Sequence, residues 1–269
     1  MLRSLFLGVL QGLTEFLPVS SSGHLALSQQ FMEMGGDTLT FDILLHAATM
    51  LATVIYFRIE ILSALKGWSE GFLSPQARKE PEWTLGWAVI AGNIFTVIIA
   101  LLLKPMVEIW VKSTLAVSSA LLVTSAVLFL ASHISPGREK LSLPRGIVVG
   151  IAQGFAVIPG LSRSGITIVT GMKMGLSPEK AFSFSFLLSI PAIIGANLLE
   201  AFAIAGDPFH KVALPTGWFI GMLAAFISGF WALKVLRKFV VQGKWRGFAF
   251  YCLAAGSLLM TINFIGGIH

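Results

Sequence analysis

The sequence predicts an all-α integral membrane protein with six full transmembrane helices, two re-entrant helical hairpins and inverted-topology repeats. Of the 269 residues, 55% are hydrophobic and only 12% are charged, whereas soluble domains carry about 25% charged residues. Several apolar runs are long enough to cross the ~30 Å hydrocarbon core of a bilayer, which takes about 20 helical residues. Two further apolar regions are interrupted near their middles and resemble each other.

The uninterrupted apolar runs predict six full spans, at 39–58, 84–104, 114–133, 180–205, 215–236 and 246–266. These runs are continuous, whereas a transmembrane β-barrel needs segments of about ten residues that alternate apolar and polar. The N-terminal residues resemble a signal peptide but lack a small-residue cleavage site, so we expect them in the mature protein. Cys252 lies within an apolar run and is interpreted as a packing residue.

The two interrupted regions are residues 2–34 and 145–175. Each half of either region is too short to span a membrane alone. The residues that break them are Pro18 and Gly23 in the first region and Pro159, Gly160 and Gly165 in the second.

These regions align without a gap at an offset of 142 positions, the difference between Gly8 and Gly150. The other matched pairs are Gln11 with Gln153, Gly12 with Gly154, Ser20 with Ser162, Ser22 with Ser164, and Gly23 with Gly165. Chance recurrence of small residues in membrane helices is the alternative, but GxxQG and SxSG match together at fixed spacing. We therefore predict a single membrane domain over 1–269 with repeats at about 1–133 and 145–269. Because each repeat holds one hairpin and three spans, the second copy enters from the opposite face.

The basic residues predict the orientation. If both hairpins are re-entrant and the spans alternate, most lysines and arginines fall on one face, including Arg58, Arg78 and Lys140, while few, such as Lys104, fall on the other. The positive-inside rule places the first face in the cytoplasm. Both termini and the mouth of the first hairpin then face outward. The net charge of +6 is accordingly explained by basic residues in the connections between spans, and no nucleic-acid partner is expected.

Candidate functional residues of the first hairpin include Gln11 and Glu15, which share a helical face. A carboxylate within a membrane is costly enough to indicate function, although Glu15 at the membrane interface is the alternative. His24 follows three serines, and a structural hydrogen-bond donor is its alternative interpretation. The serines are Ser20, Ser21 and Ser22.

The second hairpin carries Arg163, the basic residue farthest from any loop. A guanidinium is always charged and binds phosphate oxygens through two parallel hydrogen bonds. The turn around it frees backbone N–H groups at a helix start, where an anion is favoured. An ion pair between Arg163 and Glu15 is the structural alternative, and the two interpretations are compatible. The polar neighbours of Arg163 are Ser162, Ser164 and Thr167.

Together the hairpins supply a possible nucleophile, Ser21, a proton carrier, His24, and a phosphate clamp, Arg163. The offset places Ser21 opposite Arg163, which predicts that the two copies have different roles. Asp42 and His46 share a face in the first span and are interpreted as helix-packing residues.

QGLTEFLPVSSSGH at 11–24 and PGLSRSGIT at 159–167 resemble the two signatures of the undecaprenyl-diphosphate phosphatase family, also called the bacitracin-resistance proteins. The resemblance extends over essentially the whole chain, including FSFLLSIP at 184–191. It implies a bacterial inner-membrane enzyme with an outward-facing site, which removes the terminal phosphate of undecaprenyl diphosphate and so recycles the lipid carrier of cell-wall synthesis.

The resemblance also implies roles for individual residues. Ser21 would be the nucleophile and His24 its proton-transfer partner, with Glu15 in activation or metal binding. A divalent cation, Mg²⁺ or Ca²⁺, is expected. At the position of Gln11 many members carry Glu, which is a better metal ligand than Gln. Here Glu15 would therefore bind the metal, and phosphate oxygens and water would complete the shell of the ion. The predicted substrate-binding residues are Gln11, Ser20, Ser22, Arg163, Ser162, Ser164 and Thr167.

Two other function classes remain at this point. Inverted repeats with broken helices are also a transporter architecture, so a polyprenyl-phosphate flippase or another secondary transporter is the alternative. A structural scaffold would need neither Arg nor Glu at membrane depth. Small-residue faces permit a homodimer.

Overall fold

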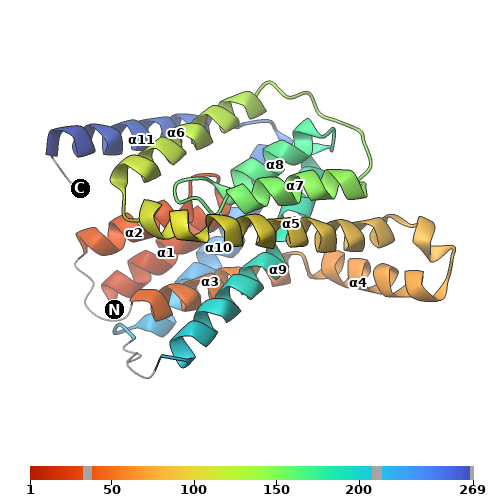
Figure 1. Ribbon diagram of the computed structural model, residues 1–269, viewed down its shortest axis with the longest axis horizontal. Coiled ribbons are helices and arrows are strands. Elements are labelled where there is room, and N and C mark those ends of the chain that lie inside the picture. The colour runs from red at the N-terminus through yellow and green to blue at the C-terminus, as the bar shows by residue number, and fades with distance from the viewer. Residues whose placement is uncertain (33–37, 208–213, 267–269) are drawn as a thin grey trace.

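The computed structural model describes residues 1–32, 38–207 and 214–266, and over these the protein is built from α-helices (Figure 1). The first half contains α1 Leu2–Phe16, α2 Ser21–Phe31, α3 Thr38–Tyr56, α4 Arg58–Leu73, α5 Pro81–Trp110 and α6 Thr114–Ala131, with a short 3-10 helix, η1 Ala77–Lys79. The second half contains α7 Leu143–Phe155, α8 Arg163–Lys173, α9 Pro178–Ala205, α10 Trp218–Val241 and α11 Arg246–Gly266.

Six helices in the described part of the chain are long and apolar enough to cross a membrane: α3, α5, α6, α9, α10 and α11. They coincide with the six predicted spans, so the protein is a multi-pass membrane protein. The predicted ends differ most in α5, which runs from Pro81 to Trp110, and in α10, which continues to Val241. Both helices extend into sequence less apolar than their centres, which a hydropathy window does not include.

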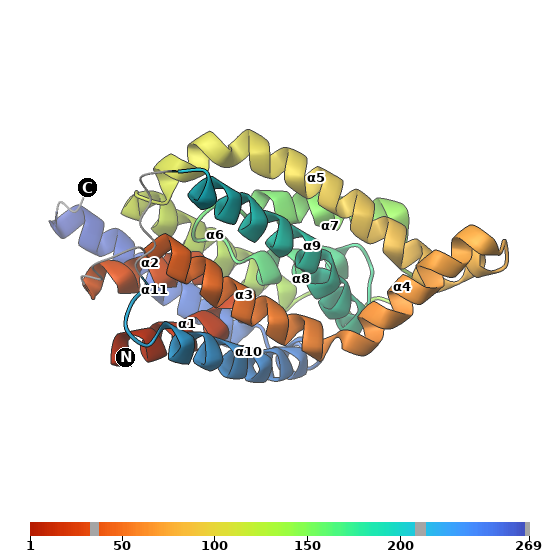
Figure 2. The ribbon, with the colours of Figure 1, turned by 90° about the horizontal axis from the view of Figure 1, so that it is seen from below.

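Helix α4 was not predicted, because its sequence is too polar and too short to read as a span. It is held against α5 by an interlock of glycines and tryptophans. A Cβ placed on Gly71 would lie 2.1 Å from Cε3 of Trp83, and one on Gly86 would lie 2.3 Å from Cδ1 of Trp68. Figure 2 shows this hairpin extending to the end of the molecule opposite the N-terminus, an end called here the α4 end.

The two predicted interruptions are present as breaks between short helices. Residues 17–20 separate α1 from α2, with Ser20 in the left-handed region at φ 69°, and residues 156–162 separate α7 from α8, with Gly160 at φ 96°. Proline within each break removes a backbone donor and stops the helix. Gly23 and Gly165, expected to help break the regions, instead lie inside α2 and α8. Helix α2 begins at Ser21 and α8 at Arg163, which is the 142-residue offset again.

Glycines let the first helix of each interrupted region approach a long helix closely. Helix α1 packs along α10 and α7 along α5. A Cβ on Gly8 would lie 2.1 Å from the carbonyl oxygen of Gly221, and one on Gly150 would lie 2.2 Å from that of Gly92. Both contacts are backbone against backbone, so neither can be relieved by moving a side chain.

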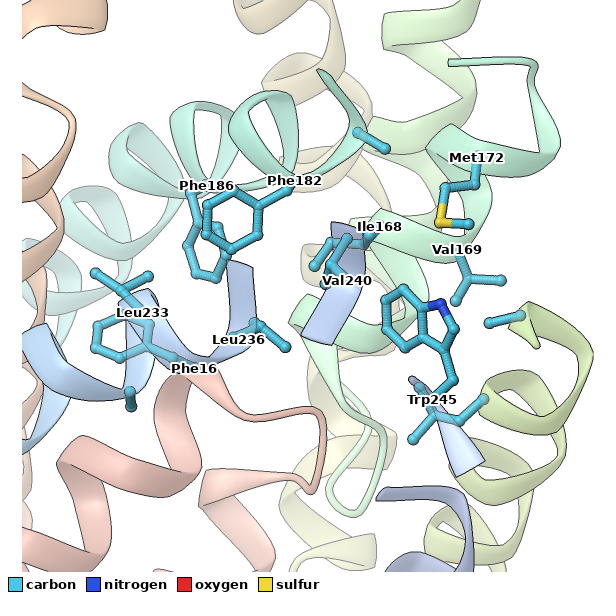
Figure 3. Packing of buried hydrophobic residues seen from close by; sticks show 14 of the residues in the cluster. Phe16, Ile168, Val169, Met172, Phe182, Phe186, Leu233, Leu236, Val240 and Trp245 are labelled. Carbon is cyan, nitrogen blue, oxygen red and sulfur yellow. The ribbon is translucent and has the colours of Figure 1, made fainter. Parts of the chain in front are cut away.

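The main hydrophobic core lies beside the two breaks, where α1, α8, α9 and α10 meet (Figure 3). Phe16 ends α1 fully buried, and its ring lies 5.8 Å from that of Phe186 in α9. Cys252 is buried and donates to the carbonyl of Pro18 at 3.5 Å, which agrees with its interpretation as a packing residue. The core therefore fixes the end of α1 against the second half of the chain.

The Gly8 contact generates a prediction about stability. Gly8→Val should lower the free energy of unfolding by roughly 3 kcal/mol or more, because overpacking against a rigid backbone costs about 1–3 kcal/mol even where relaxation is possible. Gly195→Val is the matched control, since Gly195 is also inside a helix and a Cβ placed on it would meet no described atom within 4 Å. The measurement is thermal unfolding in detergent, and equal melting temperatures for the two variants would contradict the packing argument.

Candidate active site

Glu15 is the centre of the polar site. It lies in the last turn of α1, and its side chain is only 8% exposed. Oε2 accepts a hydrogen bond from Oγ of Ser21 at 2.8 Å, and Oε1 accepts one from Nη2 of Arg163 at 2.8 Å. The structure thus brings together three of the four predicted catalytic residues, and it confirms the ion pair between Arg163 and Glu15.

Gln11 and His46 complete the surroundings of the carboxylate. Nε2 of Gln11 donates to Oε2 of Glu15 at 3.2 Å and lies 2.9 Å from Nδ1 of His46. That nitrogen is itself 3.5 Å from Oε2 of Glu15. Because an amide N–H only donates, Nδ1 of His46 accepts the hydrogen bond from Gln11. His46 was interpreted from the sequence as a helix-packing residue, and its hydrogen bond from α3 to Gln11 in α1 agrees with that interpretation, although its place beside Glu15 was not predicted.

Arg163 begins α8 and points its guanidinium toward Glu15. Its Cζ lies 5.7 Å from the ring centre of Phe186, and its side chain is 17% exposed. Nη1 is buried and has no hydrogen-bond partner among the described residues. An unsatisfied buried donor is costly, so the site holds a cationic N–H that an anion would satisfy.

Ser162, Ser164 and Thr167 hold Arg163 in place. Oγ of Ser162 caps α8 by accepting from the backbone N–H of Gly165 at 3.1 Å. Oγ of Ser164 donates to the carbonyl of Phe16 at 2.8 Å, joining the start of α8 to the end of α1. Oγ1 of Thr167 donates to the carbonyl of Arg163 at 2.8 Å. All three hydroxyls are buried, so their support of the Arg163 backbone is structural, and their contact with substrate stays a prediction.

Ser20 and Ser22 flank Ser21 differently. Ser20 is buried and Ser22 is exposed, and their Oγ atoms are 3.4 Å apart. Ser22 lines a small cavity of about 260 Å³ together with Lys112 and Pro159. Of the two predicted substrate-binding serines, only Ser22 is therefore open to a ligand.

His24 does not contact Ser21 in this structure. Its Nδ1 lies 2.7 Å from the carbonyl oxygen of Ser20, and its Nε2 lies 2.6 Å from the hydroxyl of Tyr251. The two rings are stacked, with centres 5.6 Å apart. The expected pairing of Ser21 with His24 is replaced by the Ser21 to Glu15 hydrogen bond. Tyr251 was missed because a single tyrosine in an apolar span carries no signal of its own.

The metal expectation can be tested on the available ligands. Within the described ranges no three His, Cys, Asp or Glu side chains lie close enough to hold a metal ion together. However, Oε1 of Gln11 is buried without a hydrogen-bond partner among the described residues, beside the Glu15 carboxylate. Two protein oxygens are thus available, a number that suits Mg²⁺ only if phosphate oxygens and water supply the rest of its shell.

Comparison with known proteins gives a consistent result. The family model described as bacitracin resistance protein BacA matches residues 4–258. Proteins named undecaprenyl-diphosphatase from Desulforapulum autotrophicum, Carboxydothermus hydrogenoformans and Korarchaeum cryptofilum are 39%, 37% and 36% identical to the chain. The alignments cover 98%, 98% and 97% of this chain and 98% of each relative.

The buried ion pair generates a second stability prediction. Glu15→Gln should cost about 3–5 kcal/mol, because it leaves a buried guanidinium without its carboxylate. Adding Arg163→Met should recover much of that loss, since replacing both partners removes the uncompensated charge. Unfolding in detergent measures both, with Lys66→Ala as the control for an exposed pair, Lys66 with Glu70. A double variant no more stable than Glu15→Gln would refute the role assigned to the pair.

Proposed function

We propose that this chain, which belongs to the bacitracin resistance protein BacA family, is an undecaprenyl-diphosphatase that works through the Glu15 site. It hydrolyses the terminal phosphate of undecaprenyl diphosphate and releases undecaprenyl phosphate and inorganic phosphate. The observation that carries the proposal is a serine hydroxyl hydrogen-bonded to a buried carboxylate that also binds an arginine with an unsatisfied N–H.

Ser21 is the nucleophile in this mechanism. Its Oγ attacks the terminal phosphorus, its proton passes to Oε2 of Glu15 at 2.8 Å, and the bond from that phosphorus to the bridging oxygen breaks. The leaving group is a lipid phosphate, which is stable as an anion. Water then hydrolyses the phosphoserine, returns a proton to Ser21 and leaves inorganic phosphate.

Arg163 stabilises the charge that develops on the phosphoryl oxygens. Nη1 donates to the substrate while Nη2 stays on Glu15, so the guanidinium keeps its carboxylate partner, and the atoms that cover Nη1 move aside when the substrate binds. The starts of α2 and α8, at Ser21 and Arg163, add free backbone N–H groups at the positive ends of two helix dipoles.

His24 is assigned to the second step. Because a carbonyl only accepts, its Nδ1 carries the proton, which leaves Nε2 as an acceptor for the hydroxyl of Tyr251. Nε2 is then the basic nitrogen of the ring, and it takes a proton from the attacking water when that water replaces the Tyr251 hydroxyl at its lone pair. Tyr251 is a positioning residue that fixes the orientation of the ring.

A divalent cation, Mg²⁺ or Ca²⁺, would be held by Oε1 of Gln11 and by Glu15. It would supply positive charge to the diphosphate oxygens. Gln11 would contribute to substrate binding through that ion and Ser22 through its own hydroxyl, whereas substrate contact of the buried Ser20 stays a prediction from the sequence.

The membrane arrangement belongs to the same proposal. Residues 1–133 and 145–269 are inverted repeats, and α1 with α2 and α7 with α8 are re-entrant hairpins. The equal offset of the two helix starts and the matching glycine contacts of α1 with α10 and α7 with α5 support this. The basic residues of α4 and η1 support a cytoplasmic location of the α4 end, with both termini and the Glu15 site facing outward from a bacterial inner membrane.

A lipid flippase is the second candidate function, favoured by the repeat architecture alone. Transport of a phosphate lipid needs an anion site but no nucleophile, so the Ser21 to Glu15 hydrogen bond favours the phosphatase. A homodimer through small-residue faces stays a prediction from the sequence.

The deciding experiment measures phosphate release from polyprenyl diphosphate by purified protein, with and without EDTA. Wild type should be active, and EDTA should remove most of that activity if the cation takes part. Ser21→Ala should lower kcat by 10⁴-fold or more, on the order seen when a nucleophile is removed. Ser69→Ala, at an exposed position on α4, is the control. No release under any metal condition would favour the flippase, and full activity of Ser21→Ala would remove the nucleophile.

A further prediction concerns Tyr251. Tyr251→Phe should lower kcat by roughly 10-fold, less than the 10²–10⁴-fold expected for losing a proton carrier, and should leave KM nearly unchanged. In a His24→Ala background the same substitution should have no further effect, because Tyr251 acts only through His24. Additive losses in the double variant would show that its role does not depend on the imidazole.

A further inference from the structure

A larger cavity lies at the α4 end, and it shares no lining residue with the small cavity beside Ser22. Its volume is about 600 Å³, within the ~300–1,000 Å³ range of small-molecule sites. Three buried side chains, Leu176, Phe184 and Leu187, form an apolar floor with Leu85 and Leu141. Phe184 and Leu187 of α9 face the cavity. Ser185 and Phe186, which lie between them in sequence, contact Thr167 and Arg163 instead. This one helix therefore separates the cavity from the active site.

The walls of the cavity are the beginnings of three helices. Ile59 and Glu60 come from the first turn of α4, Pro81 and Glu82 from the first turn of α5, and Lys180 from the first turn of α9. Neither α4 nor α5 has a side-chain hydrogen bond capping its N-terminus. Their free N–H groups and dipoles make the potential at the cavity more positive, which favours an anion.

Three lysines line the same cavity from separate elements. Lys79 belongs to η1, Lys140 to the segment before α7, and Lys180 to α9. None of them forms an ion pair with a described residue, although Glu60 and Glu82 also line the cavity. The lining therefore combines cationic donors with carboxylate acceptors and the hydroxyls of Ser63, Thr84 and Ser183.

We propose that this cavity binds an anionic glycerophospholipid, with the phosphate at the lysines and helix starts and one chain along the apolar floor. The carboxylates and hydroxyls accept from the free hydroxyls of a glycerol headgroup such as that of phosphatidylglycerol. A bare lipid phosphate offers no such donors, so it would pair with the lysines but leave the carboxylates and hydroxyls without a partner. Basic pockets between helices at the cytoplasmic face are typical sites for anionic headgroups.

This site differs from the active site in its position and its ligand, and it would bind a structural lipid where the active site binds a substrate. It lies across α9 from the contact of Phe186 with Arg163, and it is lined by residues of α4, η1 and the start of α5, elements whose places are seen in Figures 1 and 2. The lipid would fill the space between α4, α5 and α9 and so hold the projecting α4 hairpin against the body. The inference does not depend on the phosphatase mechanism.

The test counts lipids bound to purified protein by native mass spectrometry over a concentration series of phosphatidylglycerol. Wild type should retain one tightly bound molecule per chain, and phosphatidylcholine with the same chains should not replace it. Substituting glutamine for Lys79, Lys140 and Lys180 together should weaken binding about a hundredfold, at roughly fivefold for each lysine near a membrane surface. Phosphatase activity should remain, which verifies folding.

The matched control replaces three exposed lysines outside the cavity with glutamine: Lys66, Lys238 and Lys244. It removes the same charge and should leave the affinity within about twofold. Single variants at Lys140 and Lys180, expected to lose roughly fivefold each, keep the test valid if the triple variant unfolds. Equal loss in both triple variants, equal retention of phosphatidylcholine, or displacement of the lipid by inorganic phosphate would each overturn the proposal.

Discussion

The contact between Glu15 and Arg163 is the constraint on which the rest of the structure depends. A buried carboxylate and a buried guanidinium are each too costly to leave unpaired, and each neutralises the other across 148 positions of sequence. Keeping them together requires α1 to end and α8 to begin at one point. The broken helices, the Ser164 hydrogen bond to Phe16 and the aromatic core around Phe16 and Phe186 all serve that requirement.

The two halves of the chain have the same local form but different chemistry. Each contains a short helix, a break and the start of a second helix. In each, two serine Oγ atoms lie within hydrogen-bonding distance, at 3.4 Å in the first half and 3.3 Å in the second. Gln11 meets His46 and a carboxylate, whereas Gln153 meets Thr96 and a carbonyl oxygen. Two helical breaks of the same local form can therefore carry different chemistry, because exchanging a few side chains changes the charge without moving the backbone.

Much of the fold follows from the sequence because a bilayer imposes simple rules. Length and hydropathy are sufficient to find six spans, and proline with glycine to find two breaks. Helix α4 does not follow these rules, since it is held to α5 by a tryptophan of each helix packed on a glycine of the other. At the site, Glu15, Ser21 and Arg163 were found because polar residues are rare at such positions. His46 and Tyr251 depend on how distant helices pack, which no local pattern contains.

The packing of α1 against α10 has a consequence for biosynthesis. Residues 1–16 leave the ribosome well before their long partner, which begins only at Trp218, and before the cation that neutralises Glu15, at position 163. Until then the first hairpin has an exposed glycine face and a carboxylate without its arginine. It therefore cannot settle into its final place when it first reaches the translocon. Helix α1 is thus synthesised long before it can be packed, and a truncated chain that ends before α8 lacks both of the partners it needs.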